Sequence, residues 1–206
     1  MNRVIAYIDG YNLYHGLCDA GWQRYLWLNL PKLTESLLKP GQELMLTKYF
    51  TSRTIVEDQA KRQRQTTYIE ALQTLNNLQI IEGKQHAEPY TCFNCHQTRI
   101  IPREKMTDIN IAVEMLSDMF KNKLDTALLI SADSDLVPVI KRIRSDSDFR
   151  TKRVIIAIPP HRFSKDLANE AHGLLHIGRS RFAQSLLPKA VTRNDGFKLE
   201  CPETWS

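Results

Sequence analysis

The sequence predicts an α/β fold in one main domain, with a central, mostly parallel sheet and helices on both of its faces. Short apolar segments typical of strands alternate along the chain with amphipathic segments typical of helices, which is the pattern of a parallel sheet. One segment, RVIIAIP at 153–159, is apolar at successive positions, as expected of a central strand buried on both faces. The length of 206 residues suffices for one domain with its own core.

Six strand-like and five helical segments make up this pattern. Strands are expected at 3–9, 43–51, 78–83, 127–133, 153–159 and 174–178. Helices are expected at 57–76, 109–122, 135–144, 164–172 and 179–187. The clearest helical period lies in 109–122, where the apolar residues recur at the spacing of one helix face: Ile109, Ala112, Val113, Leu116 and Phe120.

Two segments fall outside the alternation. Residues 84–104 carry two prolines and a Cys-x-x-Cys pair, and we expect them to form a small hairpin inserted into a domain that spans 1–187. Residues 188–206 are polar and lack a period, which predicts a loose carboxyl-terminal extension.

Composition and charge set limits on the partners and the location. The chain has 28 Lys and Arg against 23 Asp and Glu, with an isoelectric point near 9.0, a balance that permits a polyanionic partner without requiring one. The first apolar run is short and Asp9 interrupts it, so we expect no signal peptide. No apolar run approaches the ~18 residues of a membrane span. We therefore predict a cytoplasmic protein with reduced cysteines and no membrane partner.

Acidic residues follow two of the predicted strands and precede a predicted helix. Asp9 ends the first strand, Asp133 and Asp135 follow the fourth, and Asp108 lies just before the helix at 109–122. In an open parallel sheet, ligands bind beyond the carboxyl ends of the strands. Carboxylates gathered there repel one another unless a cation neutralises them, and oxygen-rich sites suit Mg²⁺ or Mn²⁺. The spacing therefore predicts a divalent-metal site.

Each of these acids also has a structural interpretation, because Asp is common at helix caps and turns. Asp135 fits a helix N-cap, which would place Pro138 in the first turn, where its missing N–H costs nothing. Asp108 could cap the next helix, and Asp9 could be a turn residue. Asp133 is the hardest to explain in this way if Asp135 is the cap.

Three segments, taken in order, resemble a known family. They are VIAYIDGYNLYHG (4–16), KMTDINIAVEML (105–116) and LLISADSDLVPVI (128–140), and together they resemble the NYN domain, also called LabA-like, of the PIN-like nuclease superfamily. The resemblance covers about residues 1–185, with gaps at the cysteine insertion. It implies a PIN-like Rossmannoid three-layer fold and the activity of a metal-dependent endoribonuclease that hydrolyses RNA.

The resemblance also implies roles for single residues. Asp9, Asp108 and Asp133 match the family's acidic cluster, which would hold Mg²⁺ or Mn²⁺, and Asp135 matches an auxiliary catalytic acid. On the substrate side, Asn12 and Ser131 lie in the motifs, where Asn12 would contact an acid or the substrate and Ser131 could orient a carboxylate.

Three further residues are expected to contact RNA because of their positions and chemistry. Tyr11 flanks Asn12 and could stack on a base, since single-stranded nucleic acid is bound by aromatic rings and cations. Lys105 and Arg53 lie near a motif and a predicted strand end, which makes them candidates for phosphate contacts.

The Cys92–Cys95 pair leaves three interpretations open. A structural zinc site needs four ligands, so His86, His96 or a second copy in a homodimer would have to complete a Zn²⁺ knuckle. The alternatives are a plain hairpin turn and, less in keeping with a hairpin, a redox pair at a helix start.

Two rival functions remain beside the ribonuclease. The first is a catalytically inactive NYN module that binds RNA or a protein partner in a regulatory role. The second is a phosphatase-like hydrolase, which is disfavoured because the haloacid-dehalogenase pattern needs Asp-x-Asp at the first strand, where this chain has Asp9-Gly10-Tyr11.

Overall fold

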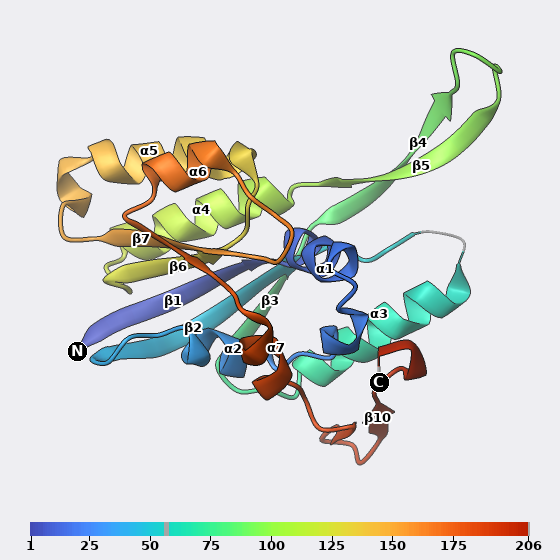
Figure 1. The fold of residues 1–206 in the computed structure, drawn as a ribbon, viewed down its shortest axis with the longest axis horizontal. Helices are drawn as coiled ribbons and strands as arrows, with labels where there is room; N and C mark the ends of the chain where they lie inside the picture. Colours follow the sequence, from blue (N-terminus) through green and yellow to red (C-terminus); the bar gives the residue numbers. More distant parts are fainter. Residues whose placement is uncertain (56–57, 206) are drawn as a thin grey trace.

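A six-stranded parallel sheet forms the centre of the molecule (Figure 1). The computed structural model describes residues 1–55 and 58–205. The strands lie in the order β3-β2-β1-β6-β7-β8, and every neighbouring pair is parallel. Their bounds are β1 Asn2–Asp9, β2 Gln42–Thr51, β3 Leu78–Glu82, β6 Thr126–Ile130, β7 Arg153–Ile158 and β8 Gly173–His176. The predicted α/β fold and all six predicted strands are confirmed.

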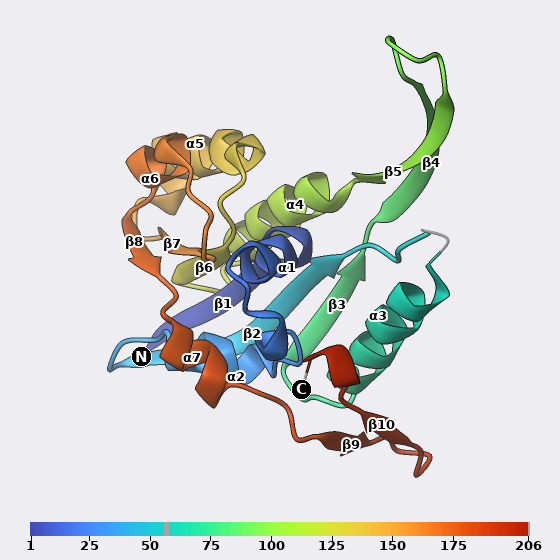
Figure 2. The same cartoon turned by 45° about the vertical axis from the view of Figure 1, so that its right-hand side comes forward.

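Helices cover both faces of this sheet (Figures 1 and 2). One apolar core lies between the sheet and helices α1, α2, α3 and α7, and a second lies between the sheet and α4, α5 and α6. Residues of β1 alternate between the two cores, as the two-residue period of a strand requires. The helices are α1 Gly10–Asp19, α2 Leu30–Ser36, α3 Gln59–Leu72, α4 Thr107–Phe120, α5 Val137–Ser145, α6 Lys165–Glu170 and α7 Arg179–Gln184.

The five predicted helices are present, with shifted ends. Residue 57, the first of the helix predicted at 57–76, lies outside the described residues. The sequence pattern did not delimit α1 or α2, whose starts are fixed by side-chain caps from Asp9 and Asn29.

The buried face of α4 differs from the prediction. Ile109, Val113 and Phe120 are 66%, 56% and 62% exposed, whereas Ile111 and Met115 are fully buried. Asp108 stands three residues before Ile111 and seven before Met115, so it shares the packed face of the helix. The helix is therefore rotated from the predicted orientation, and this rotation turns Asp108 toward the edge of the sheet.

Strand β1 marks the point where the chain reverses direction across the sheet. The chain runs outward from β1 to β2 and β3, then returns to place β6 on the other side of β1. The crevice at the carboxyl ends of β1 and β6 is thus a topological switch point, the place where such sheets bind ligands.

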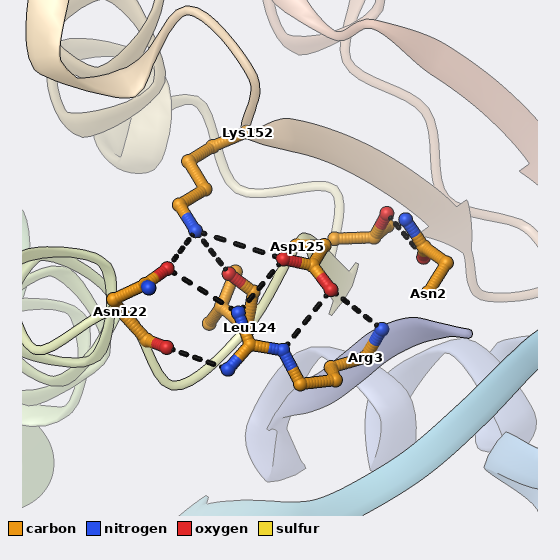
Figure 3. A network of polar contacts seen from close by, with 7 residues as sticks. Asn2, Arg3, Asn122, Leu124, Asp125 and Lys152 are labelled. Carbon is orange, nitrogen blue, oxygen red and sulfur yellow. Dashed lines mark hydrogen bonds and ion pairs between the residues drawn. The ribbon is translucent and has the colours of Figure 1, made fainter.

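The opposite edge of the sheet is held by a polar network (Figure 3). The Arg3 backbone N–H and guanidinium donate to the Asp125 carboxylate at 2.8–3.1 Å, which holds the pKa of Asp125 well below its ordinary value. The Lys152 ammonium is buried and donates to the Leu124 carbonyl at 2.7 Å and to the Asn122 side chain at 2.5 Å. Lys152, from a basic stretch of the sequence, therefore ties the α4–β6 turn to β7.

The inserted segment forms the expected hairpin. Its strands, β4 (Lys84–Thr91) and β5 (Thr98–Lys105), pair in antiparallel register and project as an arm away from the sheet (Figures 1 and 2).

The prediction of a loose carboxyl-terminal extension is wrong. Residues Ala190–Thr192 (β9) and Lys198–Glu200 (β10) pair as a small antiparallel sheet, and Leu199 is only 3% exposed. The Trp205 ring stands edge-on to Tyr68, with 5.9 Å between the ring centroids. The segment packs through single apolar residues spaced along a polar stretch, so it has no period to detect.

Across the described residues, no helix has the length and apolarity needed to cross a membrane.

Candidate acidic metal site

Three carboxylates meet at the switch point. Asp9 ends β1, Asp133 follows β6, and Asp108 lies in the first turn of α4. One oxygen atom from each lies within 4.8 Å of the others. Asp9 is 3% exposed, and the other two are half-buried. Residues from three separate segments thus form one acidic cluster, as the parallel topology predicted.

Ser131 links two of these acids. Ile8 and Ile130 are partners in the β1–β6 register, so the next residues, Asp9 and Ser131, lie side by side. The Ser131 hydroxyl donates to Asp9 Oδ2 at 2.9 Å and accepts the Asp133 backbone N–H at 3.0 Å. Ser131 is fully buried, so the expected substrate contact is wrong. Its hydroxyl instead orients the Asp9 carboxylate, the other role that the motif suggested.

Asn12 fastens the start of α1 to the loop after β6. Its backbone N–H donates to Asp9 Oδ1 at 3.0 Å, so Asp9 is the N-cap of α1. Its side-chain oxygen accepts the Ala132 N–H at 3.1 Å. Gly10 permits this tight corner, because a Cβ there would lie 2.6 Å from the Phe50 carbonyl oxygen. Asn12 therefore serves the geometry of the cluster.

Asp133 is both a member of the acidic cluster and a helix cap. The Asp135 backbone N–H donates to Asp133 Oδ1 at 3.0 Å, so Asp133 caps the short 3₁₀ helix Ser134–Leu136. The prediction that Asp135 is the cap is wrong, although Pro138 does lie in the first turn of α5. Asp135 is exposed and lies outside the cluster of three, close enough for its charge to act on Asp108.

The cluster carries a strong electrostatic penalty without a cation. Burial raises the pKa of Asp9 to about 7, with further increases from Asp108 and Glu104, against the lowering effect of the Asn12 and Ser131 hydrogen bonds. Burial and the charges of Asp133, Asp135 and Glu104 raise the pKa of Asp108 to about 6. A divalent cation would favour the ionised form of both groups.

Glu104 is an acid of the site that the sequence analysis missed. It lies near the end of β5, and its Oε1 accepts a hydrogen bond of 2.5 Å from the Thr107 hydroxyl. Met106, between them, has a left-handed φ of 78°, an uncommon conformation that turns the chain from β5 into α4. In the sequence, the only indication of this was that Glu104 stands four residues before Asp108. The turn at Met106 is what brings Glu104 close to the cluster.

The two cations expected to hold phosphates form ion pairs with neighbouring acids. The Arg53 guanidinium binds Glu82 at 2.9 Å, and the Lys105 ammonium lies 2.6 Å from Glu88. Both side chains remain partly exposed, so their expected phosphate contacts stay predictions, and a phosphate would have to compete with these acids. Tyr11 is 54% exposed and lies against His15, with ring centroids 4.2 Å apart, so its stacking role stays a prediction.

The two cysteines of the arm lie in a tight turn. The Cys92 N–H donates to the Gln97 carbonyl and the His96 N–H donates to the Cys92 carbonyl, both at 2.9 Å. Within 1–55 and 58–205, the acidic cluster is the one group of three or more His, Cys, Asp or Glu side chains close enough to share a metal. The Zn²⁺ site at Cys92 and Cys95 stays a prediction without an identified third ligand in that part of the chain.

Comparisons with known proteins give a relative by sequence and a relative by fold. The chain is 29% identical over 246 residues to 6-hydroxy-3-succinoylpyridine 3-monooxygenase HspA of Pseudomonas putida. The alignment covers 98% of this chain and 75% of that protein. The crystal structure of a protein of unknown function from Vibrio parahaemolyticus superposes with a TM-score of 0.54 at 15% identity, over 86% of this chain and 94% of that one. At that identity, the likeness shows the fold alone.

The sequence profile of the NYN domain matches residues 3–178. Apart from Asn2 at the start of β1, this range includes all six strands of the sheet, and it includes all three acids of the cluster. The chain therefore belongs to the NYN domain family, within the PIN-like nuclease superfamily.

Proposed function

We propose that the protein is a ribonuclease that uses Mg²⁺ or Mn²⁺ to hydrolyse phosphodiester bonds within RNA. The observation that carries the proposal is the meeting of three carboxylates, from three segments, with oxygens within 4.8 Å of one another. Membership of a nuclease-type family supports the reaction class.

The residues present fit a hard divalent cation. All three donors are oxygens, which Mg²⁺ and Mn²⁺ prefer. Burial, with a smaller effect of neighbouring acids, raises the pKa of Asp9, and a bound cation would counter that shift. Asp9, Asp108 and Asp133 would hold the ion. When bound, such an ion activates water and offsets the charge that develops on a phosphodiester.

The chain's own residues position the carboxylates of the cluster. Ser131 and Asn12 fix both oxygens of Asp9, so this ligand is already oriented before any ion binds. In the net reaction, a water oxygen bonds to phosphorus, one P–O bond of the diester breaks, and a water proton ends on the leaving oxygen. The products are a phosphate monoester and an alcohol.

A cleavage assay tests this proposal. Labelled RNA is incubated with the protein and Mn²⁺ or EDTA, beside Asp9→Asn and Asp133→Asn. We expect cleavage that needs the metal and is lost in both variants. RNA binding without cleavage would instead support the inactive NYN module, and equal cleavage by wild type and variants would reject the acidic site as its origin.

A second candidate activity comes from the name of the Pseudomonas relative. The specific feature in its favour is a pocket beside the cluster, lined by aromatic rings and the cations Lys61 and Arg64, which suits a ring that bears a carboxylate. Incubation with 6-hydroxy-3-succinoylpyridine, O₂ and a nicotinamide reductant tests it, with mass spectrometry for an added oxygen atom. We rank it second because it leaves the acidic cluster without a role.

A further inference from the structure

A pocket of about 130 Å³ opens beside the acidic cluster, between α1, α3 and the base of the arm. At roughly 10–15 Å³ per water molecule, this volume holds about ten waters, which is enough space for one planar ring. Gly10 and Tyr11, which line it, follow Asp9 directly in the chain. Glu104 lines the pocket as well and also acts electrostatically on Asp9. None of the three acids lines the pocket itself, but these neighbours place the pocket close enough for a polymer bound in it to continue to the acidic cluster.

Aromatic rings form much of the wall of this pocket. Tyr49 and Tyr68 are buried and line it, with 6.5 Å between ring centroids and an angle of 76° between the ring planes. Trp205 packs edge-on against Tyr68, so the carboxyl-terminal segment completes the wall. Tyr11 and Tyr14 stand nearer the opening, where Tyr11 is half exposed. The rings are mutually packed, so the wall is set before a ligand enters.

Helix α3 supplies positive charge to the same pocket. Lys61, Arg64 and Tyr68 stand three and four residues apart on one face, and all three line the pocket. Lys61 Nζ lies 6.0 Å from the centre of the Tyr14 ring. In the described part of the chain, neither Lys61 nor Arg64 has a carboxylate partner, in contrast to Arg53 and Lys105. The combination suits a ligand with a flat ring and a negative charge.

We infer that this pocket holds the base of one unpaired nucleotide of the substrate, with Lys61 and Arg64 facing its phosphates. This inference rests on the proposed function and makes it more specific. The acidic cluster repels RNA, so cations nearby have to hold the backbone, and aromatic rings stack on any base that is free of a partner. A base in a duplex cannot enter the pocket without leaving its pair. The enzyme should therefore select single-stranded RNA.

Binding in EDTA tests this inference apart from cleavage. The probe is a fluorescent single-stranded oligoribonucleotide, measured by anisotropy with wild type, Arg64→Ala and Tyr11→Ala. Arg62→Ala is the matched control, because Arg62 is an exposed cation of the same helix that does not line the pocket. Loss of a stacked ring or a phosphate contact should weaken binding about tenfold, and the control should change it less than twofold. Duplex RNA of the same sequence should compete poorly.

Equal effects of Arg64→Ala and Arg62→Ala, or equal binding of duplex and single strand, would overturn the inference. If Mn²⁺-dependent cleavage is nevertheless present and is lost in Asp133→Asn, the pocket assignment fails while the proposed function stands. If RNA binding depends on the pocket but no cleavage is seen, the pocket assignment stands while the proposed function fails. Saturable binding of nicotinate without binding of RNA would identify a small aromatic acid as the ligand and would also overturn the inference.

Discussion

Replacing Asp9 by Asn should change the pH dependence of stability in the metal-free protein. The pKa of Asp9 is raised from 3.8 to about 7 in the folded protein. Between pH 4 and pH 7 the folded state therefore keeps a proton that the unfolded state releases, so the free energy of unfolding falls as the pH rises. Above pH 7 the contribution is constant.

The structure sets the size of this effect. From pH 5 to pH 7 is two pH units, and at about 1.36 kcal/mol per unit the wild-type protein should lose about 3 kcal/mol. For a chain of this size, 1 kcal/mol corresponds to roughly 2–4 °C in the unfolding temperature, so the expected loss is about 6–12 °C. Asp108, with a pKa of about 6, adds a smaller contribution in the same direction because it is more exposed.

The assay is thermal unfolding in EDTA at pH 5 and pH 8 for wild type and Asp9→Asn. Glu43→Gln, at an exposed position of β2, controls for the removal of one negative charge. The Asp9→Asn protein should lose most of this pH dependence and be more stable than wild type at pH 8. In wild type, Mn²⁺ should raise the unfolding temperature more at pH 8 than at pH 5. The same pH dependence in Asp9→Asn and wild type would show that Asp9 does not have a raised pKa in the folded protein.

Three further predictions concern the support of the site. Ser131→Ala removes the donor to Asp9 and the acceptor for the next loop, so it should lower cleavage by 10- to 100-fold in kcat with little change in KM, measured by steady-state kinetics. Asp118→Asn leaves the buried Lys48 ammonium without one of its partners and should cost about 3 kcal/mol in urea unfolding; a cost below 1 kcal/mol would reject the importance of that pair. Gly83→Val should destabilise the corner before α4, because a Cβ at Gly83 would lie 2.7 Å from the Thr107 hydroxyl, and an unchanged unfolding temperature and activity would contradict this.

The sheet and the location of the acids could be predicted because both depend on local pattern and topology. Apolar runs gave the six strands, and the rule that parallel strands share their carboxyl edge brought Asp9 and Asp133 together. The family motifs added the expected roles of Asp108 and Ser131. These inferences need only the order of elements and the direction of each strand.

The remaining features depend on contacts that no local pattern encodes. The face of α4 that packs is chosen by the sheet, where Met115 and Ile111 are buried in place of the equally apolar Ile109 and Val113. Glu104 reaches the site only because the chain turns sharply at Met106. Likewise, Arg53 forms its ion pair with Glu82 of β3, which is distant in sequence, and Lys105 forms its ion pair with Glu88 across the arm. The pocket joins α1, α3 and the carboxyl-terminal Trp205, three parts of the chain with no common motif.

The chemistry of the cut RNA ends is the most direct test of metal-dependent hydrolysis at the acidic cluster. A single-stranded RNA carries one 2′-deoxy nucleotide at its preferred cleavage position and is incubated with the protein and Mn²⁺. Attack by water does not use the 2′-hydroxyl, so we expect cleavage at the substituted position, phosphate monoester ends without a 2′,3′-cyclic phosphate, and loss of cleavage in Asp133→Asn. Cleavage that is blocked by the 2′-deoxy substitution, persists in EDTA or leaves cyclic phosphate would contradict a metal-dependent hydrolysis at the acidic cluster.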